Sequence, residues 1–125
     1  MDTNGVGNLI IGYNELSAPG GNPNGNFRTG SHNLIVGTGN SYTSYGGAVI
    51  GSSNTAFGLF ATVTAGLRNT ASGDYSSVSG GSVNSATTTG SSVVGGYVNT
   101  VTGGELASIL GGVNIVVSQE EGNYP

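Results

Sequence analysis

The chain contains no cysteine and no tryptophan, and only 6% of its 125 residues are charged. Without cysteine it can form no disulfide and offers no thiolate. Its only cations are Arg28 and Arg68 and its net charge is −4, so a phosphate backbone would find little to bind and we expect no nucleic-acid partner. No apolar run is long enough to span a bilayer, and Met1 to Gly5 form neither a basic nor an apolar region. The sequence therefore predicts no membrane insertion and no signal peptide in this segment.

Large apolar side chains are also scarce. The chain has three phenylalanines and six tyrosines against 25 glycines, and its apolar share is 35%. Glycine loses more conformational entropy on folding than other residues, and small side chains supply little core volume. We therefore expect a single chain to be marginally stable and symmetric self-association to compensate.

What the sequence does have is a short repeat of constant length. Every fifteenth position is held by asparagine in one series and, three positions upstream, by glycine in another: Asn54, Asn69, Asn84, Asn99 and Asn114, with Gly51, Gly66, Gly81, Gly96 and Gly111. A short fixed period of this kind predicts an all-β parallel β-solenoid, in which each repeat is one coil stacked on the next. Glycine tolerates positive φ and close backbone approach, and stacked asparagines can form a ladder, so we expect these residues to be structural corners.

Each coil is expected to contain two short strands. Alternation places Val78 on an inward face between Ser77 and Ser79, and Ala86 belongs to a second inward column. The predicted core columns are Ala48, Val63, Val78, Val93 and Ala56, Ala71, Ala86, Val101, Val116.

We expect one domain over residues 1–125, with regular coils at 32–118 and a cap or junction at 119–125. Asn8 to Gly12 closely matches Asn33 to Gly37, which predicts two more strands of the same kind. Residues 13–31 lie between them and are rich in proline, glycine and asparagine. This segment is predicted to be an insertion loop that projects from the solenoid.

Two segments, Gly73 to Asn84 and Thr89 to Asn99, carry a Ser-Val-x-x-Gly strand followed by a turn. They resemble the head repeats of trimeric autotransporter adhesins, and similar repeats occur in bacterial surface and phage fibre proteins. The resemblance implies a left-handed parallel β-roll, an intertwined or side-by-side homotrimer, and adhesion to host or matrix components. The repeat here is one residue longer than is usual in that family.

A row of valines gives a separate argument for the homotrimer. Val83, Val98 and Val113 precede the asparagine column and would form an apolar row at a corner. A three-fold axis would cover that row. The alternative is that these valines close the chain's own core.

The candidate binding residues are aromatic or lie on the insertion. Tyr45, Phe60 and Tyr75 keep the interval of the repeat and are expected to stack as an aromatic column. Such a column could bind sugars or protein partners, or pack against an adjacent protomer. Phe27 and Arg28 are candidates for specific recognition, unless the insertion is only a disordered or cap-forming loop.

Catalytic groups are few. His32 is the only histidine, has no nearby acid, and is expected to be structural. Asp74 and Glu105 form the best carboxylate pair, about 10 Å apart by strand spacing, which is near the range for inverting glycoside hydrolysis. A calcium roll would need an aspartate in nearly every coil, and only Asp74 lies within the repeats. We expect no enzyme, no metal site and no cofactor.

The leading expectation is a structural or adhesive segment of an extracellular trimeric fibre or surface adhesin, at a cell surface or on a phage virion. Its partners would be its own copies and a host-surface or glycan ligand. One alternative is a carbohydrate-binding or carbohydrate-cleaving phage-fibre domain. A remote alternative is an ice-binding solenoid, because a column of hydroxyl side chains resembles such arrays: Thr55, Thr70, Ser85 and Thr100. Hydroxyl side chains are also ordinary on solvent-facing strands.

Overall fold

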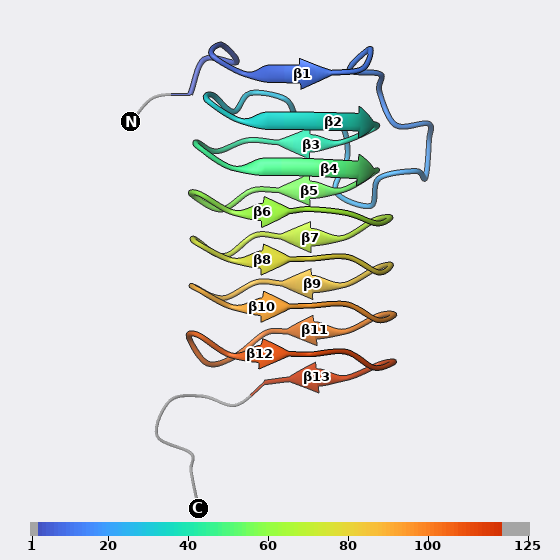
Figure 1. Cartoon of the computed structure of the whole chain (residues 1–125), viewed down its shortest axis with the longest axis vertical. Coiled ribbons are helices and arrows are strands. Elements are labelled where there is room, and N and C mark those ends of the chain that lie inside the picture. The colour runs from blue at the N-terminus through green and yellow to red at the C-terminus, as the bar shows by residue number, and fades with distance from the viewer. Residues whose placement is uncertain (1–2, 119–125) are drawn as a thin grey trace, which may run out of the picture.

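The computed structural model describes residues 3–118, and the predicted cap or junction at 119–125 lies outside them. This part of the chain is a β-solenoid of 13 strands without a helix (Figure 1). Every strand pair is parallel, so the predicted all-β parallel solenoid is confirmed.

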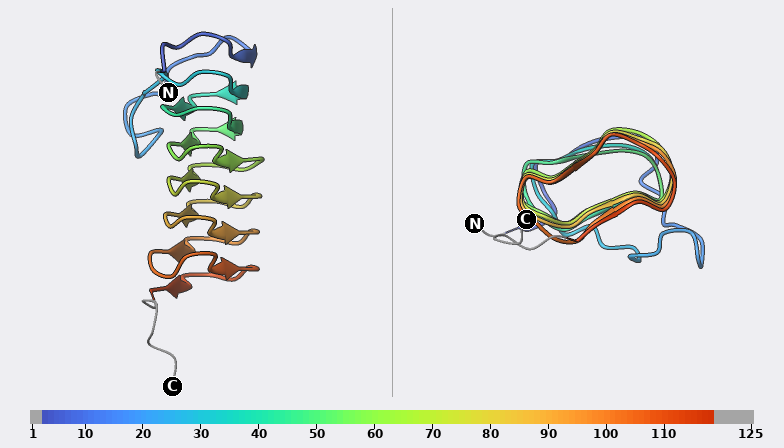
Figure 2. Two further views of the ribbon diagram at one scale, coloured as in Figure 1. Left: turned by 90° about the vertical axis from the view of Figure 1, so that its left-hand side faces the viewer. Right: turned by 90° about the horizontal axis from the view of Figure 1, so that it is seen from below.

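The strands form two sheets that face each other across a narrow core (Figure 2). Sheet A contains β1 (Leu9–Ile11), β2 (Leu34–Thr38), β4 (Ala48–Ser52), β6 (Thr62–Val63), β8 (Ser77–Val78), β10 (Ser92–Val93) and β12 (Ser108–Ile109). Sheet B contains β3 (Ser41–Tyr42), β5 (Thr55–Ala56), β7 (Thr70–Ala71), β9 (Ser85–Ala86), β11 (Thr100–Val101) and β13 (Val116–Val117). In Figure 1 the right turns lead from sheet A to sheet B, and the left turns lead back to sheet A of the next coil.

The coils have equal length only in the middle of the solenoid. Thr62 pairs with Ser77, and Ser77 with Ser92, which keeps the interval of the repeat. By contrast, Ala48 pairs with Thr62, one residue short of that interval, and Ser92 pairs with Ser108, one residue beyond it. The interior columns are Ile35, Val49, Val63, Val78, Val93, Ile109 and Tyr42, Ala56, Ala71, Ala86, Val101, Val117.

Two predicted core residues are therefore wrong. Val49 is fully buried where Ala48 was expected, and Val117 packs against the core where Val116 was expected. Side chains alternate across a strand, so a shift of one residue moves a side chain to the opposite face. A prediction that assumes a constant period therefore assigns the wrong residue to the core wherever a coil is one residue shorter or longer.

Glycines sit at the right turns, where successive coils approach closely. Gly51, Gly66, Gly81 and Gly96 have φ between 79° and 116°. A Cβ at any of the four would lie 2.1–2.5 Å from the carbonyl oxygen of the corresponding glycine one coil further on. In the longer last coil Gly112, with φ of 127°, takes this place. The expectation that Gly111 is a corner of the same kind is wrong, because the extra residue displaces it.

Buried asparagines join the coils immediately after these turns. Each side-chain Oδ1 accepts a hydrogen bond from the backbone N–H at the equivalent position of the next coil, at 2.9–3.0 Å. Each Nδ2 donates to two backbone carbonyls, one four residues upstream and one in the following coil. The ladder comprises Asn40, Asn54, Asn69, Asn84 and Asn99.

The ladder differs from the predicted column at both ends. Asn40 belongs to it although it lies one residue closer to Asn54 than the repeat requires. At the other end Asn99 accepts from the N–H of Ile115, so the series stops at a side chain that has no amide. Asn114 is exposed, with φ of 57°, and lies outside the ladder. Its expected role in the column is wrong for the same reason as that of Gly111.

Candidate functional site

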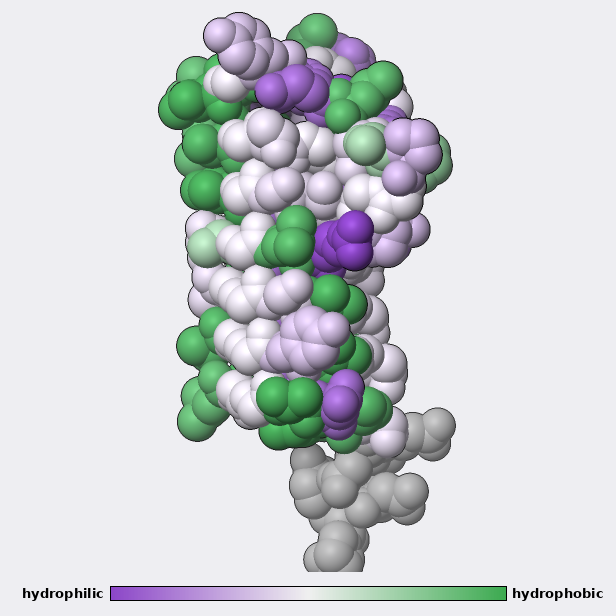
Figure 3. Space-filling view, turned by 90° about the vertical axis from the view of Figure 1, so that its right-hand side faces the viewer, coloured by the Kyte–Doolittle hydropathy of each residue, from purple (hydrophilic) through white to green (hydrophobic). Residues whose placement is uncertain are grey.

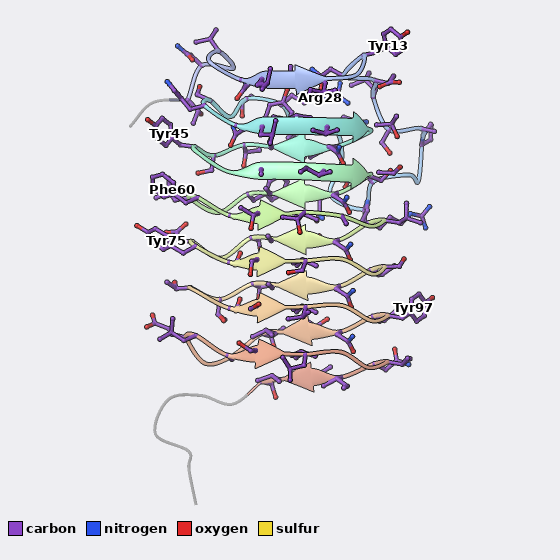
Figure 4. The ribbon with its side chains drawn as sticks, viewed as in Figure 1. Tyr13, Arg28, Tyr45, Phe60, Tyr75 and Tyr97 are labelled. Carbon is purple, nitrogen blue, oxygen red and sulfur yellow. The ribbon has the colours of Figure 1, made fainter. Side chains whose placement is uncertain are left out.

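Four rings line the left turns of the upper coils. The His32 and Tyr45 ring centroids are 4.8 Å apart, and Tyr45 meets Phe60 edge-on at 5.8 Å. Phe60 and Tyr75 stack at 5.6 Å with an interplanar angle of 12°. Tyr45, Phe60 and Tyr75 project from the same edge of the solenoid (Figure 4). We call His32, Tyr45, Phe60 and Tyr75 the ring row.

The ring row is built on one backbone position that has positive φ in every coil. That position is held by His32, Gly46, Phe60, Tyr75, Gly90 and Leu106, with φ between 54° and 73°. The position equivalent to Phe60 in the preceding coil is therefore Gly46, and Tyr45 lies one residue before it. Because Gly46 has no side chain, the Phe60 ring can occupy that space and contact the Tyr45 ring. His32 was missed as a member. His32 lies 14 residues before Gly46, whereas the repeat has 15 residues, so a constant period did not predict that the two positions are equivalent.

A second exposed feature follows the right turns. Leu67, Val83, Tyr97, Val98 and Val113 lie at this corner, and we call them the corner strip. Arg68, Ser82 and Asn114 stand in the same columns, and Figure 3 shows the apolar groups of this side separated by polar ones. Parallel bridges stack Leu67, Ser82, Tyr97 and Val113 in one column. Val83 and Val98 occupy the next position with φ of 58° and 57°. The three valines thus stand in two columns on the surface, and they do not close the chain's own core.

The insertion lies outside the outline of the coils and is held to them by hydrogen bonds (Figure 2). It crosses sheet B and covers the upper strands of that sheet (Figure 2). Asn22 donates to the carbonyls of Gly39 and Asn54, and Asn24 donates to the hydroxyls of Thr55 and Thr70. The insertion is thus bound to sheet B by hydrogen bonds from its asparagine side chains.

The insertion covers part of the hydroxyl column formed by Thr55, Thr70, Ser85 and Thr100. Thr55 is fully buried, and Asn24 engages the hydroxyls of both Thr55 and Thr70. Only the Ser85 and Thr100 portion of the column continues beyond those contacts.

Both candidate recognition residues of the insertion contact the protein itself. The Arg28 guanidinium donates to the carbonyls of Asn14, Glu15 and Asn40. Phe27 packs edge-on against Phe57, the residue after β5, at a centroid distance of 6.2 Å, although half of its surface remains exposed. Arg28 therefore holds the insertion in place, while Phe27 still presents one side to solvent.

Arg68, the other cation, holds the middle of the insertion by donating to Gly21 and Gly20 at 2.8 and 3.1 Å. We predict that Arg68→Gln releases this part of the insertion, so that chymotrypsin cleaves at Tyr13 and Phe27 about fivefold faster. Val83→Ala is the matched control, because Val83 holds the same position one coil on. Equal cleavage rates in Arg68→Gln and the parent protein would contradict the prediction.

The two candidate acids occupy one column at the left turns. Backbone hydrogen bonds align Leu59, Asp74 and Thr89 just before the positive-φ position, and the longer last coil places Glu105 next in that column. Asp74 accepts the N–H of Leu59 at 2.9 Å, and both acids are exposed. Among residues 3–118 no group of three or more His, Cys, Asp or Glu side chains is arranged to hold a metal.

The chain matches no protein-family model, no curated protein and no solved structure. Within the described part of the chain there is also no helix that could cross a membrane.

Proposed function

We propose that the chain is a non-catalytic structural and adhesive segment of an extracellular fibre or surface adhesin. The observation that carries this proposal is the buried asparagine ladder, in which each asparagine side chain makes two hydrogen bonds to the next coil and one within its own coil. Such a ladder makes the coils a straight, repetitive body whose length grows with the number of repeats. A body of this kind suits a spacer that presents side chains along its edges.

We further propose that the coils wind in a left-handed sense, as in the adhesin head repeats. In Figure 1 the sheet A strands lie on the near side and run to the right, and the sheet B strands return behind them. The chain descends from β1 to β13 as it turns. That combination of directions supports left-handed winding.

The homotrimer is proposed to form through the corner strip. Val113 is 62% exposed and Tyr97 is 53% exposed, and several exposed apolar side chains on one side of a protein favour an interaction site there. Side-by-side chains related by a three-fold axis would bring three copies of the strip together and bury it.

Sedimentation equilibrium tests the assembly. We expect three times the mass of one chain for the parent protein, and a single chain's mass for the double variant Val83→Asp and Val98→Asp. Aspartate tolerates the positive φ of both positions. Ser79→Asp, at an exposed position beside sheet A, is the control and should remain trimeric. A parent protein that sediments as one chain would refute the trimer.

Carbohydrate binding is kept as a second candidate function because the ring row is exposed at Phe60 and Tyr75. A glycan array probed with Tyr45→Ala and Tyr75→Ala variants tests it. Ice binding is not proposed, since the insertion engages two members of the hydroxyl column.

A further inference from the structure

Tyr75 is the last residue of the ring row, and no other ring of the row covers the face of Tyr75 that is turned away from Phe60. Phe60 stacks on the other face, at a centroid distance of 5.6 Å. The next coil places Gly90, which has no side chain, at the position equivalent to Tyr75. Tyr75 is 62% exposed and points away from the solenoid (Figure 4). The row thus stops at an accessible aromatic face.

The opposite side of this opening is formed by the last coil. Leu106 occupies the equivalent position two coils beyond Tyr75, and its side chain reaches back to Gly90, where an added Cβ would lie 2.5 Å from Leu106 Cδ2. Leu106 is itself 76% exposed. The backbones of the Tyr75 and Leu106 coils are about 9.6 Å apart by strand spacing, and the Leu106 side chain fills the part of that height below Gly90. The remaining space lies directly beneath the exposed face of the Tyr75 ring.

The charges near the opening are all of one sign. Asp74 directly precedes Tyr75, and Glu105 directly precedes Leu106. Both cations of the chain, Arg28 and Arg68, donate to backbone carbonyls at the insertion. The Asp74 carboxylate accepts the N–H of Leu59 in the coil above, and Glu105 belongs to the coil below the opening, so a positive ligand at Tyr75 would have negative charge on both sides and no competing arginine.

We propose that the exposed face of Tyr75 binds a trimethylammonium group, with Asp74 and Glu105 supplying the attractive field. A cation over an aromatic face is attracted by the negative potential of the ring. Quaternary ammonium is favoured over the lysine ammonium, because the latter is a compact and strongly hydrated charge that a surface ring desolvates poorly. This gives a ligand class to the adhesive role proposed above and rests on that role.

Choline chloride is the probe, and the ring protons of Tyr75 are followed by NMR. Choline should bind at least about tenfold more tightly than its uncharged isostere 3,3-dimethylbutan-1-ol, and added salt should weaken it. Phosphatidylcholine vesicles and a trimethyl-lysine peptide then distinguish a lipid source of the group from a protein source. Equal binding of choline and the isostere would overturn the proposal, as would tighter binding of n-butylammonium or of methyl β-glucoside.

Variants at four positions test the geometry. Tyr75→Leu should weaken choline binding about fivefold, and it should fold because Leu106 already occupies the same backbone conformation. Gly90→Tyr should extend the stack and block the site. Asp74→Asn keeps an acceptor for the N–H of Leu59, and it and Glu105→Gln should each weaken binding about threefold.

The matched control is Tyr13→Leu, an exposed tyrosine on the opposite edge and outside the corner strip, which should leave choline binding unchanged. Undiminished binding by folded Tyr75→Leu or Gly90→Tyr would refute the site. Mass in solution is measured separately, so a monomer that binds choline contradicts only the trimer. A trimer that does not bind contradicts only this inference.

Discussion

Replacing Gly81 by alanine is expected to lower the free energy of unfolding by more than about 4 kcal/mol, or to prevent folding. The added Cβ would lie 2.2 Å from the Gly96 carbonyl oxygen and 2.8 Å from the Gly96 nitrogen, and φ at Gly81 is 79°. Both contacts are with backbone, which is held by the hydrogen bonds between coils. The structure therefore cannot relieve the overlap by rotating a side chain.

The adjacent glycine provides the matched control. At Gly80 an added Cβ would meet only Ala65 Cβ, at 3.8 Å, and Ala65 shows that alanine already fits the equivalent position one coil earlier. Gly80→Ala should be neutral or should stabilise the fold by about 0.5 kcal/mol, since alanine restricts the unfolded chain. Urea unfolding followed by circular dichroism measures both variants. Similar midpoints for the two would show that the close approach at Gly81 is not a constraint.

Replacing Asn84 by alanine is expected to cost about 3 kcal/mol in the free energy of unfolding. The side chain is 1% exposed and makes three hydrogen bonds: from the N–H of Asn99 at 2.9 Å, to Gly80 at 3.1 Å and to Gly96 at 2.9 Å. Its removal leaves a buried N–H and two carbonyls without these partners, and each unmade buried hydrogen bond costs about 1 kcal/mol or more. Unfolding in urea gives the change in free energy, and hydrogen exchange at the Asn99 amide reports the local effect.

A variant at Asn114 distinguishes the effect of the hydrogen bonds in the ladder from the effect of the position in the sequence repeat. It belongs to the same sequence column as Asn84, but it is exposed and outside the ladder. Asn114→Ala should therefore cost less than about 1 kcal/mol, mainly because alanine is less suited than asparagine to positive φ. A loss as large as that of Asn84→Ala would indicate that the asparagine column acts through sequence position and not through the hydrogen bonds seen here.

The middle of the solenoid was predictable because its coils have equal length. Val63, Val78 and Val93 are fully buried as expected, and Ala71 and Ala86 line the second interior column. Errors in the core, glycine and asparagine columns appear only where coil length changes: at Ala48, Gly111, Asn114 and Val116. The ring row shows the same limit, since its aromatic residues were recognised but His32 was not.

The contacts of the insertion could not be predicted. Its composition indicated a loop, but nothing in the order of its residues showed that Asn24 would donate to hydroxyls of two different coils. Contacts between residues 31 and 46 positions apart depend on how the whole chain is arranged, and local sequence carries no signal for them.

By itself, the sequence determined the solenoid, the glycine turns and the asparagine column of the regular coils. It could do so because a fixed spacing of small and amide residues satisfies the same local backbone requirements in every coil. Tertiary structure alone decided where the coils shorten and lengthen, how the insertion covers sheet B, and which ring face stays open. Those features depend on hydrogen bonding and packing between neighbouring coils, where a difference of one residue changes which side chains meet.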